Sequence, residues 1–421
     1  MCDALWGETT LATISATAST VNNRTREFFA ERQAEDRQRL IKVLIGAGII
    51  ALYPFVDSLL GLGLLGSWIP ILVYLLLAMG LNIVVGYAGL LDLGYVAFFV
   101  IGAYSQAFMT SPNSVFVQNG WIPPFFQNFW PAMALSWVVA AICGAIIGAP
   151  TLRLRGDYLA IVTLGFGEIV PNFFTNAAGI TRGPRGIGQI AKPPTIHLPG
   201  GRSIGFGTTD QFQWFWLILI VCLISLFIIT RLHDSRMGRA WQAIREDEIA
   251  AASMGINPVR TKLWAFALGA SFSGFGGSLY SGYVGVVYPD QFQFSLSIII
   301  LSMVILGGIG NIYGVIAGAL IIGSFDRILT EKLNTPINWL GRQIESWGPL
   351  EPIGTFLSKH SLTSDRFLIF GLALVLIMLL RPGGLFPSAR RAAEMAGDDD
   401  NYDFDEYETN QSIHDAREQG A

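Results

Sequence analysis

Residues 69–88 read IPILVYLLLAMGLNIVVGYA and include no charged side chain. A helix needs about 20 mainly apolar residues to cross roughly 30 Å of hydrocarbon, so this run predicts a transmembrane helix. Comparable runs recur along the chain, which is 52% hydrophobic and 14% charged and has a mean hydropathy of +0.48. A soluble protein would have to bury several such runs in one core, so the composition indicates a membrane protein.

The apolar runs predict an all-α fold, a polytopic transmembrane bundle of about 8–10 helices, some of them broken. Ten crossings would leave both termini on one side, and Lys and Arg in the short loops place that side in the cytoplasm. Four basic residues in the outer segment 178–213 weaken this orientation without reversing it. The candidate spans lie near residues 42–60, 69–88, 93–109, 131–149, 158–177, 214–230, 263–285, 295–309, 312–326 and 367–381.

Outside the predicted transmembrane domain, residues 42–385, the chain changes character. Residues 1–41 are polar and carry a mixed-charge run, which we interpret as a cytoplasmic extension. Residues 386–421 hold eight carboxylates between Glu394 and Glu408, which is typical of a solvated, disordered tail. Two long loops, 231–262 and 327–366, interrupt the spans.

Polar side chains interrupt the apolar pattern between the second and third predicted spans. Asn82 and Asp92 lie at or near membrane depth, in a segment that also holds Gly86 and Gly89. An ionisable group at this depth is a functional candidate, so we predict that the segment lines a substrate path. The alternative is structural: Asp92 would cap the next helix, and Asn82 would bond to a neighbouring helix. Glu168, inside another apolar run, poses the same choice.

Glycine concentrates a second time in residues 303–319, which read MVILGGIGNIYGVIAGA. The middle of this stretch is too rich in glycine for one continuous helix. It predicts a tight helical hairpin, because small residues let backbones approach closely in lipid. The glycine spacing loosely resembles that of residues 81–103, as in an internal repeat, but the identity is so low that chance explains it better. The hairpin glycines are Gly307, Gly308, Gly310 and Gly314.

The 231–262 loop has the period of an amphipathic helix that lies outside the bilayer. Gly255, ahead of Asn257 and Pro258, gives the stop signal. The helix could rest on the membrane surface, but its mixed charges favour a docking helix for a cytoplasmic partner. The apolar stripe consists of Ala240, Ile244, Ala251 and Met254. The polar shoulder consists of Arg245, Glu246, Asp247 and Glu248.

No catalytic or metal-binding pattern is apparent. The sequence has neither a GxxxxGK[ST] P-loop nor an HExxH pair, and its three cysteines and four histidines are scattered. We therefore expect no catalytic residue, no bound metal and no cofactor. A net charge of −4 also gives no footprint for nucleic acid.

Together these segments resemble the LivM-type permease subunit of branched-chain amino acid ABC importers, within a wider permease group that serves urea, amides and some sugars. The resemblance covers roughly residues 69–385. It rests on GYAGLLDLGYVAFF at 86–99, LRGDYLAIVTLG at 154–165, REDEIAAASMGIN at 245–257 and the glycine hairpin.

The resemblance implies a multi-pass protein of a bacterial cytoplasmic (inner) membrane, surrounded by membrane lipid. The implied partners are a homologous second permease, two cytoplasmic ABC ATPase subunits and an extracytoplasmic substrate-binding protein. It also implies that the 240–256 helix is the coupling helix. Glu248 stands seven residues before Gly255, as in the LivM-type variant, whereas the general pattern has six. The coupling role is therefore carried over to the segment and not to one carboxylate.

The expected function is a non-enzymatic permease subunit that forms the path for leucine, isoleucine and valine. The same architecture could import urea, short amides or another small polar solute. A channel or ion-coupled carrier without ATPases is a second alternative, against which the predicted docking helix argues. A membrane enzyme is the third, and the sequence offers no paired acid, base or metal ligands for it.

Overall fold

The computed structural model describes residues 46, 48, 50–61, 63–151, 157–197, 203–207 and 210–329, together with scattered positions between 339 and 386. The chain divides into two compact units, residues 1–63 and residues 64–421. In the first unit, Ile50–Leu60 is an apolar helix in which the Tyr53 hydroxyl donates to Asp57 Oδ1 (3.5 Å). The predicted extension 1–41 and nearly all of 327–366 and 386–421 lie outside the described residues.

Five segments of the described second unit are long and apolar enough to cross a membrane. The all-α bundle expected from the sequence is therefore confirmed. The segments are Leu65–Tyr87, Phe129–Thr151, Tyr158–Asn176, Gln211–His233 and Pro289–Gly307. They comprise α2 (Leu65–Leu81) with its π-helical extension η1 (Asn82–Tyr87), α5 (Phe129–Thr151), α6 (Asp157–Asn176), α8 (Gln211–His233) and the turn η4 (Pro289–Gln291) followed by α12 (Phe294–Gly307).

The helix α2 lies inside the bundle, and every residue from Ile69 to Leu81 is buried. Burial on all sides suits a helix that is apolar all round. Its neighbours are α8, α12, α11 (Pro258–Val284) and α13 (Ile312–Ser324). After η1 the backbone leaves the helix at Gly89, whose φ of +69° favours glycine, and a new helix, α3 (Val96–Thr110), begins. The bundle thus contains a broken helix between residues 88 and 95.

The helix α11 packs against α5, α3 and α2. At its crossing with α3, a methyl group on Gly102 would overlap the Gly274 backbone, and one on Gly277 would overlap the Phe99 carbonyl. Glycine therefore lets the two backbones touch. The 27 residues of α11 extend about 40 Å at 1.5 Å per residue, enough to cross a membrane, although its glycines and serines lower its hydropathy.

A tight turn joins α12 to α13. Gly307 and Gly314 face each other so closely that a methyl group on either would overlap the backbone of the other. Gly308 and Gly310, with φ of +116° and +88°, form the turn between them. After α13 the chain continues as the π-helical segment η5 (Phe325–Leu329).

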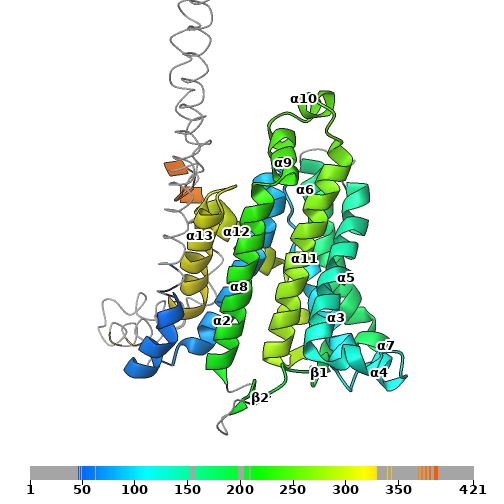
Figure 1. Cartoon of the computed structure of the whole chain (residues 1–421), viewed down its shortest axis with the longest axis vertical. Helices are drawn as coiled ribbons and strands as arrows, with labels where there is room; N and C mark the ends of the chain where they lie inside the picture. The colour runs from blue at the N-terminus through cyan, green and yellow to red at the C-terminus, as the bar shows by residue number, and fades with distance from the viewer. Residues whose placement is uncertain are drawn as a thin grey trace, which may run out of the picture. The chain divides into compact units, whose positions relative to one another are not determined.

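The short elements lie at the two ends of this unit (Figure 1). At one end lie α9 (Arg236–Glu246) and α10 (Glu248–Ser253). At the other end lie α4 (Val115–Gln118), α7 (Ala178–Thr181), β1 (Ile187–Gly188) and β2 (Ile196–His197). The strand β1 pairs antiparallel with β4 (Val286–Val287), and β2 with β3 (Ser203–Ile204). Two 3-10 turns, η2 (Pro124–Gln127) and η3 (Gly183–Arg185), complete the described elements.

Two of the predicted spans contain α-helices shorter than a full crossing. The helices α3 and α13, predicted as 93–109 and 312–326, have 15 and 13 residues, or about 22 Å and 20 Å. Roughly 30 Å would be needed. The helix α3 follows the break and α13 follows the hairpin turn and continues into η5, and broken helices of this kind also occur in transporters.

Candidate functional site

Two short helices form the loop between α8 and α11, where the sequence predicted one continuous helix over 240–256. That prediction was wrong because Asp247 has an extended backbone and caps a new helix. Its carboxylate accepts hydrogen bonds from the backbone N–H groups of Ile249 (2.8 Å) and Ala250 (3.0 Å). Ile244 and Ala251 are buried as expected, whereas Met254 is 84% exposed and leaves the predicted apolar stripe.

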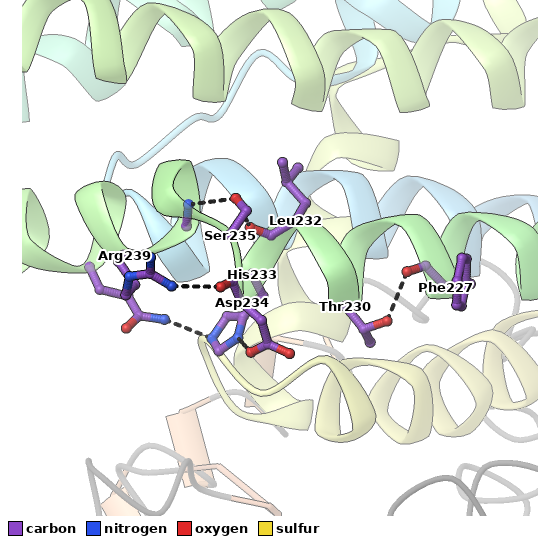
Figure 2. Close-up of polar contacts among 9 residues, drawn as sticks. Phe227, Thr230, Leu232, His233, Asp234, Ser235 and Arg239 are labelled. Carbon is purple, nitrogen blue, oxygen red and sulfur yellow. Dashed lines mark hydrogen bonds and ion pairs between the residues drawn. The ribbon is translucent and has the colours of Figure 1, made fainter. Parts of the chain in front are cut away.

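Polar contacts hold the turn from α8 into α9 (Figure 2). The Ser235 hydroxyl donates to the Leu232 carbonyl (2.6 Å), and Arg239 donates to the Asp234 carbonyl (2.8 Å). The ring of His233 contacts Asp234 through Nδ1 (3.1 Å) and the Gln242 amide through Nε2 (2.8 Å). These contacts fix the direction in which α9 leaves the transmembrane helix.

The buried face of α9 docks on the beginning of α11. The Trp241 indole is fully buried and donates to the Thr261 carbonyl (2.7 Å). The next helix, α10, is joined to α11 by an ion pair between Glu248 and Lys262 (2.8 Å). The side chain of Lys262 is only 11% exposed, so this charge depends on its partner. The loop is therefore held to the bundle by two independent polar contacts.

A third contact reaches the broken helix. The Arg245 guanidinium donates to the Gly86 carbonyl, at the end of η1. Glycine is needed around this side chain: a methyl group on Gly89 would lie 2.8 Å from Arg245 Cγ, and one on Gly310 would lie 2.9 Å from its Nη1. Arg245 thus lies between the broken helix and the α12–α13 turn.

Asn82 ties the same two elements together directly. Its side chain is fully buried, and its Oδ1 accepts a hydrogen bond from the Gly310 backbone N–H (3.0 Å). The Asn82 side chain therefore forms the bond to a neighbouring helical element that the structural alternative required. Asn82, Gly86, Gly89, Arg245 and Gly310 form one cluster, which we call the coupling junction.

Asp92 lies outside the coupling junction, in the segment ahead of α3. It is 2% exposed, and its Oδ1 accepts from the Gly94 backbone N–H (2.9 Å). The N-cap of α3 is Tyr95, so Asp92 stabilises the preceding turn and is not the cap itself. Its Oδ2 is buried without a hydrogen-bond partner among the described residues.

Glu168 belongs to a different region. It is exposed on α6 and lines a cavity of about 370 Å³ together with residues of η4 and the start of α12. The predicted path residues therefore do not form a single site. Glu246 and Gly255 also lie apart from the coupling junction, at exposed positions of the loop.

Sequence reasoning missed a charge pair after the end of α13, in which Asp326 is buried and Arg327 is partly exposed. The Arg327 guanidinium donates to the Tyr74 hydroxyl of α2 and lies 3.4 Å from the Asp326 carboxylate and 5.4 Å from the centre of the Tyr74 ring. Adjacent opposite charges at the end of an apolar run were the available signal, because buried charges in membranes are found in pairs. Across the described residues, no three His, Cys, Asp or Glu side chains converge as a metal site.

The comparisons with known proteins decide the family. Residues 63–345, about two thirds of the chain, match the family model described as "Branched-chain amino acid transport system / permease component". The chain belongs to this family. The resemblance to LivM-type permeases is confirmed, and the protein is a multi-pass membrane permease component.

The relatives of this permease include LivM proteins and LivH proteins, both described as permease proteins of a branched-chain amino acid transport system. The LivM protein of Salmonella typhimurium is 38% identical over 334 residues, which cover 76% of this chain and 69% of the relative. The LivM protein of Escherichia coli is 37% identical over the same shares. The LivH protein of Escherichia coli is 26% identical over 270 residues, or 62% and 83% of the two chains. No solved structure matches this chain.

For this permease the matched region contains the coupling junction, the α9–α10 loop and the cavity beside Glu168. The family match tests none of the predicted path or coupling residues individually, so their roles remain predictions.

Proposed function

We propose that this chain is a permease subunit of an ATP-driven importer for leucine, isoleucine and valine in a bacterial cytoplasmic membrane. The substrate comes from the names of the LivM relatives, both described as parts of a high-affinity branched-chain amino acid transport system. The observation that carries the mechanism is the Arg245 contact with the Gly86 carbonyl. It connects a loop outside the bundle to a broken helix inside it.

The partners follow from the same proposal. A homologous permease of the LivH type forms the path with this chain, two ABC ATPases hydrolyse ATP, and a binding protein delivers the amino acid from outside. The α9–α10 loop carries the exposed apolar side chains Ile249 (72%) and Met254 (84%), and Val259 (59%) follows in the first turn of α11. Apolar side chains on an aqueous loop support a docking surface for an ATPase. The end with α9 and α10 is then cytoplasmic, as are both termini.

Residues 42–385 make up the permease domain in this proposal, with the extension 1–41 and the tail 386–421 outside it. ATP-driven closure of the ATPases pushes α9 and α10. Arg245 passes the displacement to the backbone of η1, while Trp241 and Glu248 pass it to α11. Because the coupling junction joins η1 to the α12–α13 turn, both broken elements move together and the path opens to one side at a time.

The test is uptake of radiolabelled leucine into proteoliposomes that contain this chain, its neighbouring permease and ATPases, with the binding protein outside. ATP-dependent accumulation of leucine is expected. Uptake of urea but not leucine would keep the architecture and refute the substrate. Uptake that needs neither ATP nor the ATPases would refute the importer.

A further inference from the structure

The helix α6 carries a polar face where a lipid-facing helix would be apolar. Glu168, Asn172 and Asn176 follow one another at four-residue intervals and are all exposed. This spacing places them on one side of the helix. Glu168 lies eight residues, or about 12 Å, before the end of α6, near the middle of the candidate membrane span Tyr158–Asn176. A carboxylate there would be costly in hydrocarbon, so this face borders water or protein.

The polar face opens on the cavity of about 370 Å³ between α6 and the segment that leads into α12. Asp290 and Gln293 line the opposite wall, and Phe292 and Phe294 add aromatic surface. The volume is within the range of small-molecule sites. The C-terminal half of α6 leads into α7, which lies at the end of the bundle opposite α9 and α10 (Figure 1).

The α6 side of the cavity offers mainly hydrogen-bond acceptors. The Asn172 amide nitrogen donates to the Glu168 backbone carbonyl (2.9 Å), and the Thr175 hydroxyl donates to the Pro171 carbonyl (3.0 Å). These bonds engage one N–H of the Asn172 amide and the Thr175 hydroxyl hydrogen, and the Asn172 and Thr175 side-chain oxygens can still accept from a ligand. Two carboxylates add acceptors only, and within the described residues neither Glu168 nor Asp290 has a Lys or Arg nitrogen within 4 Å.

We propose that this cavity binds the primary ammonium group of the transported amino acid as it enters from the side opposite the coupling loop. An ammonium group supplies three donors and a positive charge, which match an acceptor wall with two carboxylates. Aromatic and proline surface beside them suits a branched aliphatic side chain. The inference rests on the proposed function for the identity of the ligand, but the cavity and its charges do not depend on it.

The test measures binding to the purified complex of both permeases and ATPases in lipid nanodiscs, by isothermal titration calorimetry. The probe is 3-methylbutylammonium, which is leucine without its carboxylate. Its affinity is expected to fall at least about tenfold in Glu168→Gln and in Asp290→Asn, since each variant loses a charge-assisted contact. The matched control is Asn176→Ala, on the same face but outside the cavity, which should bind as the unmodified complex does.

The other possible outcomes argue against binding of the ammonium group in this cavity. Absence of binding to the unmodified complex, an unreduced affinity in both charge variants, or displacement of the probe by sodium at equal concentration would overturn the proposal. If one variant fails to assemble, the other still decides. Leucine uptake is measured on the same preparation. A complex that binds the probe but does not accumulate leucine refutes only the proposed function. A complex that accumulates leucine but does not bind the probe refutes only the proposed binding in the cavity.

Discussion

Replacing Arg245 with methionine tests the coupling junction. Methionine keeps an unbranched chain of similar length but cannot donate to the Gly86 carbonyl. A hydrogen bond from a charged group contributes about 1.5–3 kcal/mol, and each 1.4 kcal/mol is a factor of about ten in an equilibrium. The population in which α9 is joined to the broken helix should therefore fall about 10- to 150-fold.

The assay is ATP-dependent leucine uptake and ATP hydrolysis in proteoliposomes with the complete transporter. Uptake by Arg245→Met should fall at least about tenfold while ATP hydrolysis continues, because the ATPases still bind the loop but no longer move the broken helix. Arg245→Lys keeps the charge without the planar guanidinium and should give an intermediate rate.

Arg239→Met is the matched control for this variant. Arg239 lies on the same helix and also donates to a backbone carbonyl, that of Asp234, but this contact is exposed and does not reach a membrane-embedded element. Solvent-exposed contacts of charged groups contribute about 0–1 kcal/mol, so uptake should stay within about twofold. Equal rates in Arg245→Met and Arg239→Met would refute a mechanical role for the junction.

Four further variants test the packing and the polar contacts. Gly102→Ala should lower the free energy of unfolding by about 1–3 kcal/mol, because the added methyl group overlaps the α11 backbone. Gly165→Ala should raise it by about 0.5–1 kcal/mol, because the added methyl group meets no atom within 4 Å. Thermal unfolding of the purified protein measures the sign of each change. Glu248→Gln should lower the free energy of unfolding by about 1–3 kcal/mol by leaving the largely buried Lys262 ammonium without its counter-charge. An unchanged midpoint of thermal unfolding would contradict this. Asn82→Leu should reduce both leucine uptake and the free energy of unfolding, because it leaves the Gly310 N–H without an acceptor.

The sequence predicted those elements whose pattern is contained in one short stretch of the chain. A span such as 69–88 is visible because membrane thickness sets its length, and the α12–α13 turn is visible because its glycines are adjacent in the chain. The break inside the α9–α10 loop also had a local signal, since Asp followed by Glu is a helix start. The apolar period on both sides of Asp247 suggested one helix and masked that start.

The contacts that make up the candidate site were not predictable in the same way. Asn82 and Gly310 are 228 residues apart, and Gly86 and Arg245 are 159 apart. Composition and period specify that each segment is helical, glycine-rich or amphipathic, but not which segments meet. The contact of Arg327 with Tyr74, 253 residues away, was missed for the same reason.

The junction acts on backbone, and this limits how its motion can be absorbed. The Arg245 side chain bonds to a backbone carbonyl and the Asn82 side chain to a backbone N–H, so each side chain acts directly on the main chain of η1 or of the α12–α13 turn. The helix α11, joined to the loop by Trp241, meets α3 through glycine backbones that cannot be compressed. Ahead of α3, Gly94 packs against the backbone of α6 one turn before Glu168. In the proposed mechanism a push on the loop would therefore reach the α6 cavity through packed backbones, and the non-helical residues 88–95 are where the chain would bend.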